Sequence, residues 1–421
     1  MKILLSNATI FDSSSKFHQK KSDILVEDGA ISKIGKGLSA KKVVDCSGKQ
    51  VFPGFVDLFA HFNDPGFEQK EDLASGSRVA ISGGFTDVAL IPNNKPVTET
   101  KADVEYIRSQ SRYGVDLWPI GAVSEGAEGE NLTEILDLHH AGARAFSDGL
   151  NSIWNTELLL KALQYVQKFN GLIINRPKDK HLSMHTHMHE GIVSTLMGLK
   201  GEPSISEELA IQRDLDILRY AGGRLHFNQI STEKSVKLIK NAKKEGLNVT
   251  CDVGIHHLIF TDEHIADFDS NFKSDPPFRS EKDRKALIKG LTEGTIDVIV
   301  SAHQPQDTEN KELEFDLAAF GLIGMQTVYP ILQLLKNDLP LDISIPALTT
   351  KPRELLGLAS VKVEEGFPAK LTIADPSEKW QFDHTVNQSK SLNSPLLNQA
   401  HTGKVHGILN GILYEVPHEY A

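Results

Sequence analysis

Polar side chains follow several apolar segments of the chain at the points where those segments end. The segment VFPGFVDLF leads directly to His61 and Asn63, and an alternation of period 2 places Asp57, Phe59 and His61 on one face. The ends of later segments supply the other candidates for a pocket: Asn93, Asp148, Asn175, Gln229, His303 and Gln306. A hydrolytic zinc centre needs several imidazoles and carboxylates at one place. Most of these residues are amides, which bind first-row metals weakly, so the pattern predicts a polar pocket that is poor in metal ligands.

Three of these residues, His61, Asp148 and His303, could form a mononuclear metal site if the fold brought them together. Each also has an ordinary structural role. A single inward imidazole such as His61 is more often a hydrogen-bonded core group, and an aspartate such as Asp148 can cap a helix or a loop. For His303, a role in packing or in a loop hydrogen bond is the better interpretation. We therefore expect no bound metal, with His61 and Asp148 as the ligands if one is held.

A second group of imidazoles lies in the segment SMHTHMHEG, where His185, His187 and His189 occupy alternate positions. Three imidazoles at this spacing can chelate zinc or nickel. The segment belongs to the longest irregular stretch of the chain, from Lys178 to Ser206. This placement is more typical of a solvated loop than of a metal site.

An alternation of apolar strands and amphipathic helices must position these residues. The strand candidates are VFPGFVDLF, TDVALIP, VDLWPIGAV, ARAFS, LIIN, RLHFNQI, LNVTCDV and IDVIVSA. Helical stretches such as TELLLKALQYVQKF and EKSVKLIKNAKKEG separate most of them. Repeated strand–helix units of this number predict an α/β fold of the (β/α)₈ TIM-barrel type, in which function lies at the carboxyl ends of the strands.

Both ends of the chain read as β-sheet. The alternating segments KILLSNATI and DILVEDGAISKIG open it, and VKVEEGFPAKLTIADP and GKVHGILNGILYEV close it. Two β-rich ends most simply pair with each other. We therefore expect a small β-sandwich domain of residues 1–52 plus 360–421, beside a barrel of residues 53–359.

The composition excludes several classes of partner. The 421 residues carry 45 Lys and Arg against 56 Asp and Glu, a net charge of −11, whereas nucleic acids and anionic membranes attract clustered cations. No apolar run approaches the length of a membrane span, and the short apolar start does not form a signal peptide. With only two cysteines, no disulfide framework is available, and we expect a cytoplasmic protein.

Several longer motifs resemble the dihydroorotases of the amidohydrolase superfamily. PGFVDLFAHFNDPGFEQKED and GGFTDVALIPNNKPVTET resemble the opening of that family, and RAFSDG, RLHFNQIST, SDPPFRSEKDR and GTIDVIVSAHQP continue the resemblance in the same order over nearly the whole chain. The resemblance implies a TIM barrel that catalyses the reversible ring closure of N-carbamoyl-L-aspartate to dihydroorotate in pyrimidine biosynthesis. It also implies a zinc centre and an aspartate base.

The zinc ligands that the resemblance implies are mostly replaced in this chain. Phe59, Asn175 and Gln229 stand at three positions where the family has zinc histidines, and His61 is the histidine that remains. A doubled aspartate of the family is reduced to Asp148 followed by Gly149. So many changes within a retained scaffold predict that the zinc centre is lost.

The residues that the family uses on substrate have changed as well. Ala302 stands at the position of the family's catalytic aspartate. Asn63 replaces an arginine that holds the substrate carboxylate, and Gln306 replaces a histidine that helps to hold the substrate. Asn93, another carboxylate contact, is retained. Without zinc no water is acidified, and without the aspartate no base takes its proton. The sequence therefore predicts a catalytically silent site.

The chain thus resembles non-catalytic dihydroorotase homologues that accompany aspartate transcarbamoylases in some bacteria and hold them in their active assembly. We expect aspartate transcarbamoylase as a partner and self-association into a homo-oligomer. Two alternatives stay open. One is an active dihydroorotase or related cyclic amidohydrolase with an atypical mononuclear metal site, which would use zinc. The other is a sensor that binds a carbamoyl or pyrimidine ligand.

Overall fold

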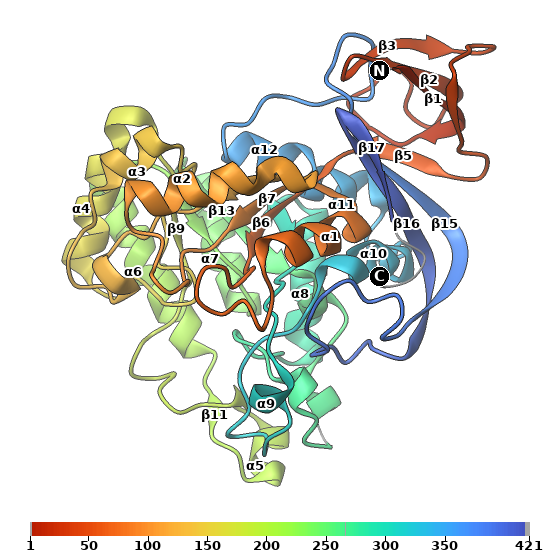
Figure 1. Ribbon diagram of the computed structural model, residues 1–421. Coiled ribbons are helices and arrows are strands. Elements are labelled where there is room, and N and C mark those ends of the chain that lie inside the picture. The colour runs from red at the N-terminus through yellow and green to blue at the C-terminus, as the bar shows by residue number, and fades with distance from the viewer. Residues whose placement is uncertain (1, 266, 417–421) are drawn as a thin grey trace.

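A parallel β-barrel surrounded by helices forms the body of the molecule in the computed structural model, which describes residues 2–265 and 267–416 (Figure 1). Its strands are β6 (Phe55–Ala60), β7 (Phe85–Leu90), β8 (Asp116–Pro119), β9 (Ile173–Asn175), β12 (Leu225–Phe227), β13 (Val249–Gly254) and β14 (Val298–Val300). Single bridges from Phe146 to Gly121 and to Ile173 join β8 to β9, and a bridge from Ala60 to His303 closes the circle. The predicted TIM barrel is therefore confirmed.

The fourth predicted strand, ARAFS, is reduced to these bridges at Phe146. All the other predicted segments form regular strands. The backbone N–H of Phe146 still donates to the carbonyl of Leu172, and the N–H of Gly121 donates to the carbonyl of Ala145. The segment therefore keeps its place in the barrel wall with a minimum of strand structure.

Helices cover the outside of the barrel (Figure 1). They are α1 (Leu73–Gly83), α2 (Lys101–Ser109), α3 (Ile135–Ala141), α4 (Thr156–Val166), α6 (Ile205–Ala221), α7 (Glu233–Lys244), α8 (Glu281–Thr292), α10 (Val328–Leu335), α11 (Leu341–Leu348) and α12 (Thr350–Leu355). Their ends follow local sequence signals. Asp72 and Ser75 form a reciprocal capping box at the start of α1, and Gly84 ends the helix at φ 90°, a conformation that glycine adopts without strain.

The two ends of the chain pair in one sheet beside the barrel, as predicted. Its strands are β1 (Lys2–Ile10), β2 (Lys21–Glu27), β3 (Ala30–Gly35), β4 (Lys42–Asp45), β5 (Gln50–Pro53), β15 (Lys370–Phe382), β16 (Gln399–Asn410) and β17 (Ile412–Glu415). β5 joins the two ends, because it pairs in parallel with β1 and antiparallel with β15, where Val51 lies opposite Ile373. Both strand-paired residues belong to the apolar cluster of this sheet.

The stretch from Lys178 to Ser206 is more ordered than its sequence predicts. It contains β10 (Met188–His189), α5 (Ile192–Met197) and β11 (Gly201–Glu202), which are too short to give a clear periodicity. These elements share a small core of Met188, Ile265 and Phe315 with residues 262–265, 267–272 and 308–317. The last of these ranges includes α9 (Thr308–Lys311). We call this assembly the lobe. It extends from the barrel at the bottom of Figure 1, far from β1 to β3.

No helix among the described residues combines the length and the apolar character needed to cross a bilayer.

Candidate functional site

The end of β6 brings a phenylalanine to the mouth of the barrel. The pairing of β6 with β7 shifts register between Asp57 and Ala60, so the strict alternation expected for Asp57, Phe59 and His61 is interrupted there. Phe59 is buried in one apolar cluster with Val56 and Leu58. Asp57 instead accepts hydrogen bonds from the hydroxyl and the backbone N–H of Ser301, and burial raises its pKa to about 7.

His61 and Asn63 are both buried just beyond this strand. Burial lowers the pKa of His61 to about 4, so the imidazole is neutral at physiological pH. Its Nε2 atom and the Nδ2 atom of Asn63 have no hydrogen-bond partner among the described residues. Asn63 adopts φ 60°, a left-handed conformation that asparagine tolerates better than most residues.

Arg176, which the sequence analysis did not single out, contacts the predicted pocket residue Gln229 and the ring of Phe59. Its guanidinium donates from Nη2 to Oε1 of Gln229 at 3.2 Å, and its carbon Cζ lies 5.8 Å from the centre of the Phe59 ring. Only 3% of Arg176 is exposed, and Nη1 has no hydrogen-bond partner among the described residues. A fixed positive charge therefore occupies the space between Phe59 and Gln229.

The amide of Asn175 is used to support the surrounding backbone. Its Oδ1 accepts from the N–H of Ile153 at 2.8 Å, and its Nδ2 donates to Oδ2 of Asp214 at 2.6 Å. Both residues of the side-chain pair are fully buried. Since each polar atom of Asn175 already has a partner, the side chain acts as a structural bridge.

Asp148 is also committed to the backbone around it. Its Oδ1 accepts from the N–H groups of Val123 and Ser124 at 3.0 and 2.9 Å, and its Oδ2 accepts from the Ser124 hydroxyl at 2.6 Å. Burial nevertheless raises the pKa of Asp148. Three donors hold this carboxylate as a loop anchor.

The neighbouring Gly149 cannot be replaced by a larger residue without a clash. Its φ is 63°, and an added Cβ atom would lie 1.9 Å from Oδ1 of Asn93. Asn93 in turn donates to the carbonyl of Asp148 and accepts from the N–H of Leu150. The retained Asn93 thus occupies the space that a second aspartate side chain would need.

The end of the eighth strand is equally filled. Ala302 adopts φ 52°, and its methyl group offers no proton acceptor. His303 is fully buried; its Nδ1 accepts from the N–H of Gly324 at 3.2 Å, and its Nε2 lies 3.6 Å from Oε2 of Glu71. Gln306 accepts from Nζ of Lys70 at 2.7 Å. These contacts tie the eighth strand to the loop that follows β6.

Beyond Arg176, a second cation continues the charged network. Nζ of Lys178 lies 2.9 Å from Oδ1 of Asp275 and 3.2 Å from Oε2 of Glu202, and Arg279 also pairs with Glu202, at 2.8 Å. Burial alone would raise the pKa of Asp275, but the charges of Lys178 and Arg176 hold it below its usual range. Sequence reasoning could have found the pair, because Arg176 and Lys178 directly follow the end of β9, where a barrel places functional groups.

The space left at the barrel mouth is divided unequally. The cavity lined by Gln229, His256, His257 and Ala302 has a volume of about 10 Å³, room for about one water molecule. A wider cavity of about 480 Å³ lies to one side, lined by residues that include Leu150, Trp154, Lys178 and Asp275. The space beside Gln229 and Ala302 is therefore nearly closed, and wider space lies beside Lys178 and Asp275.

The histidines of the lobe do not form a common site. Nδ1 of His189 lies 3.3 Å from Nη1 of Arg279, and burial and the charge of Arg279 lower the pKa of His189 to about 4. His187 is half-buried, and His185 is exposed. Within the described ranges, the three imidazoles do not converge as metal ligands.

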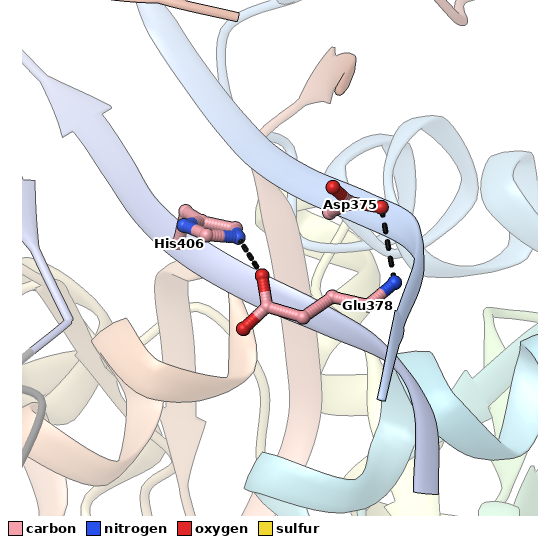
Figure 2. A group of neighbouring side chains, drawn as sticks. All are labelled: Asp375, Glu378 and His406. Atoms are coloured by element: carbon pink, nitrogen blue, oxygen red, sulfur yellow. Dashed lines mark hydrogen bonds and ion pairs between the residues drawn. The ribbon is translucent and has the colours of Figure 1, made fainter. Parts of the chain in front are cut away.

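Among the described residues, side chains that could hold a metal ion converge only in the terminal β-sheet, at Asp375, Glu378 and His406 (Figure 2). Nε2 of His406 lies 2.7 Å from Oε2 of Glu378, whose other oxygen lies 3.1 Å from Nζ of Lys404. Asp375 accepts from the N–H groups of Ser377 and Glu378. Ion pairing and a turn thus account for this group without a metal.

The barrel mouth does not fit the zinc ion that the fold family implies. Both carboxylate oxygens of Asp148 already accept hydrogen bonds, and Gln229 accepts one from the Arg176 guanidinium. In the described part of the chain, His61, Asp148 and His303 are not gathered into one group of ligands. The guanidinium of Arg176, close to Phe59 and Gln229, would also repel a metal cation.

Comparisons with known proteins agree with this fold. Residues 48–235 match the family described as dihydro-orotase-like. The chain is similar to the dihydroorotase of Acetivibrio thermocellus, with 41% identity over 93% of this chain and 92% of that relative. It is 36% identical to the dihydroorotase of Geobacter sp. strain M21, over 99% of this chain and all of that relative.

Solved structures show the same architecture at lower identity. An L-hydantoinase from Arthrobacter aurescens superposes with a TM-score of 0.85 at 24% identity, covering 98% of this chain and 97% of that one. A dihydropyrimidinase from Brevibacillus agri superposes with a TM-score of 0.80 at 18% identity, over 98% and 95% of the two chains. Since the sequence similarity to the dihydroorotases extends over nearly the whole of both chains, this protein belongs to the dihydroorotase family.

Proposed function

We propose that this member of the dihydroorotase family has no dihydroorotase activity and acts as a structural subunit of aspartate transcarbamoylase in pyrimidine biosynthesis. The observation that carries the first half is the position of Arg176, whose guanidinium bonds Gln229 and covers Phe59. The buried guanidinium there supplies positive charge and fills volume in place of zinc. Unlike zinc, it cannot bind a water molecule and acidify it to hydroxide.

The chemistry of the site supports the loss of activity. Cyclisation of N-carbamoyl-L-aspartate needs an electrophile to polarise the carboxyl group under attack and a group to take the proton of the attacking nitrogen. The side chain at the family's base position, Ala302, is a methyl group. His61 is neutral but buried, and His303 is held by Gly324 and lies beside Glu71. General acid–base catalysis alone contributes roughly 10²- to 10⁴-fold, so the combined losses leave no useful rate.

Retention of the scaffold supports the structural role. The terminal sheet, the barrel and the helices around it are retained in the described residues, with the fourth strand reduced to bridges, although the side chains at the family's catalytic positions differ. A fold that is maintained without its chemistry fits a protein whose surface is what is used. The resemblance to non-catalytic homologues gives the partner, aspartate transcarbamoylase, and a homo-oligomeric form.

Reconstitution with aspartate transcarbamoylase from the same organism tests this proposal. Both proteins are purified separately, and transcarbamoylase activity and sedimentation are measured alone and after mixing. We expect a mixed assembly of higher mass and a rise in transcarbamoylase activity. Two separate sedimenting species, with full transcarbamoylase activity in the absence of this chain, would contradict the proposal.

The wide cavity favours a second candidate function, the binding of a small ligand. Its volume of about 480 Å³ lies in the usual range for small-molecule sites, and its walls carry both charges, on Lys178 and Asp275. A carbamoyl or pyrimidine compound would then bind without reacting. Thermal unfolding with and without N-carbamoyl-L-aspartate and dihydroorotate tests this, because a bound ligand raises the melting temperature. No rise with either compound would contradict it.

The atypical active site that the sequence left open is not supported. It would use His61 and Asp148 as metal ligands, but both carboxylate oxygens of Asp148 already accept hydrogen bonds from the segment at Val123 and Ser124. Metal binding would require this loop anchor to be given up.

A further inference from the structure

Helix α5 of the lobe presents two large apolar side chains almost completely to solvent. Ile192 is 80% exposed and Leu196 is 82% exposed. They are four residues apart and so lie on one face of the helix, while Val193 and Met197 on the other face pack against the lobe core. The helix is thus held in place by its inner face and leaves an outer apolar face uncovered.

Two other segments that pack on the same small core add further exposed apolar side chains. Phe315 belongs to the lobe core, and the flanking Leu313 and Leu317 are 45% and 65% exposed. Phe268, which follows the core residue Ile265, is 49% exposed. Soluble proteins rarely gather exposed apolar side chains of this size on one small projection unless it contacts a partner.

Carboxylates surround these apolar side chains. Glu312, Glu314 and Asp316 are exposed around Leu313 and Leu317, and Asp267 and Asp269 are exposed on either side of Phe268. In the described part of the chain, none of these carboxylates forms an ion pair. By contrast, α7 and α8 pair their surface charges, for example Lys240 with Glu293.

Few cations balance this charge: in the described part of the lobe Lys200, between α5 and β11, is exposed, and its ammonium donates to the carbonyl of Met184 at 2.7 Å. Within residues 262–265, 267–272 and 308–317 the lysine is Lys311, which is buried and whose ammonium donates to the carbonyls of Ser270 and Ala319. The surface is therefore apolar at its centre and acidic around it, which complements a surface that is apolar and basic.

We propose that this surface of the lobe, formed by α5 and residues 267–269 and 312–317, is where the chain binds aspartate transcarbamoylase, through a patch of apolar side chains ringed by Lys and Arg on that partner. The inference rests on the proposed function, which supplies the partner. A second copy of this chain fits less well, because a two-fold contact would place like carboxylates opposite one another.

Variants of exposed residues test the surface without disturbing the fold. Ile192→Ser with Leu196→Ser removes the apolar face of α5, and Glu312→Lys with Glu314→Lys reverses the charge beside it. The matched control is Leu334→Ser on α10, since Leu334 is 72% exposed but lies outside the lobe. Affinity for purified aspartate transcarbamoylase of the same organism is measured by biolayer interferometry at low and high salt.

We expect the serine pair to weaken binding about tenfold or more, and the lysine pair to slow association and reduce its dependence on salt, while Leu334→Ser binds as the unchanged chain does. Equal binding by the unchanged chain and both lobe variants would overturn the inference and leave the proposed function intact. No binding by the unchanged chain would overturn both. If instead the serine pair only lowers the mass of the chain on its own in sedimentation, the surface is a contact between copies and the inference is wrong.

Discussion

The replacement Arg176→Met isolates the contribution of the buried cation, because it keeps most of the side-chain length and removes the charge. The change loses a hydrogen bond from a charged group to Gln229, of about 1.5–3 kcal/mol, and a cation–π contact with Phe59, of about 1–2 kcal/mol. It also relieves the cost of burying a guanidinium whose Nη1 has no partner among the described residues. We expect a net loss of about 2 kcal/mol in the free energy of unfolding.

Urea unfolding followed by circular dichroism measures this difference. The control is Arg144→Met, which removes an exposed arginine 5.1 Å from the ring centre of Trp118 and should change stability by less than about 0.5 kcal/mol. If Arg176→Met is as stable as the unchanged chain or more stable, then the desolvation of the guanidinium outweighs its contacts. That result would refute the reasoning that a cation stabilises the site in place of zinc.

Two further changes test the filled site. Gly149→Asp restores a doubled aspartate but places a Cβ atom against Asn93 at a residue with φ 63°. We expect thermal unfolding to show a loss of several kcal/mol in stability. The control Gly198→Ala should lose less stability, because φ there is 67° but the space around it is open. Burial lowers the pKa of His61 and of His257 to about 4, so only the unfolded chain takes up these protons as pH falls from about 6.5 to 4. Stability should therefore decrease between pH 7.5 and pH 5 by roughly 2 kcal/mol for each imidazole. In urea unfolding at the two pH values, His61→Gln should make that loss of stability smaller by roughly 2 kcal/mol. An unchanged pH dependence would contradict the low pKa of His61.

The fold was predictable because its signals are local. Apolar segments of strand length alternate with amphipathic helices, and this rhythm led to the barrel even though ARAFS forms only bridges at Phe146. The pairing of the two chain ends also followed from their alternating patterns, and β5 joins them. The elements of the lobe were missed because strands of two residues and a helix of six leave no period in the sequence.

The site was predictable only in part. The sequence indicated which ligand types were lost, but it did not indicate what replaced them. Arg176 was overlooked because arginine is usually exposed, and its burial depends on Phe59 and Gln229, which are distant in sequence and meet only in the closed barrel. The role of Gly149 was likewise hidden, since the approach of Asn93 comes from another strand end.

The proposed inactivity is tested most directly by an assay of N-carbamoyl-L-aspartate cyclisation. The chain is purified, with zinc supplied, from a host that lacks its own dihydroorotase, and bound metal is quantified on the same sample. We expect no turnover above the host background and no stoichiometric zinc. Turnover of about 1 per second or more, together with one or more zinc ions per chain, would show that Arg176 does not occupy the place of the metal and that the site is an active one.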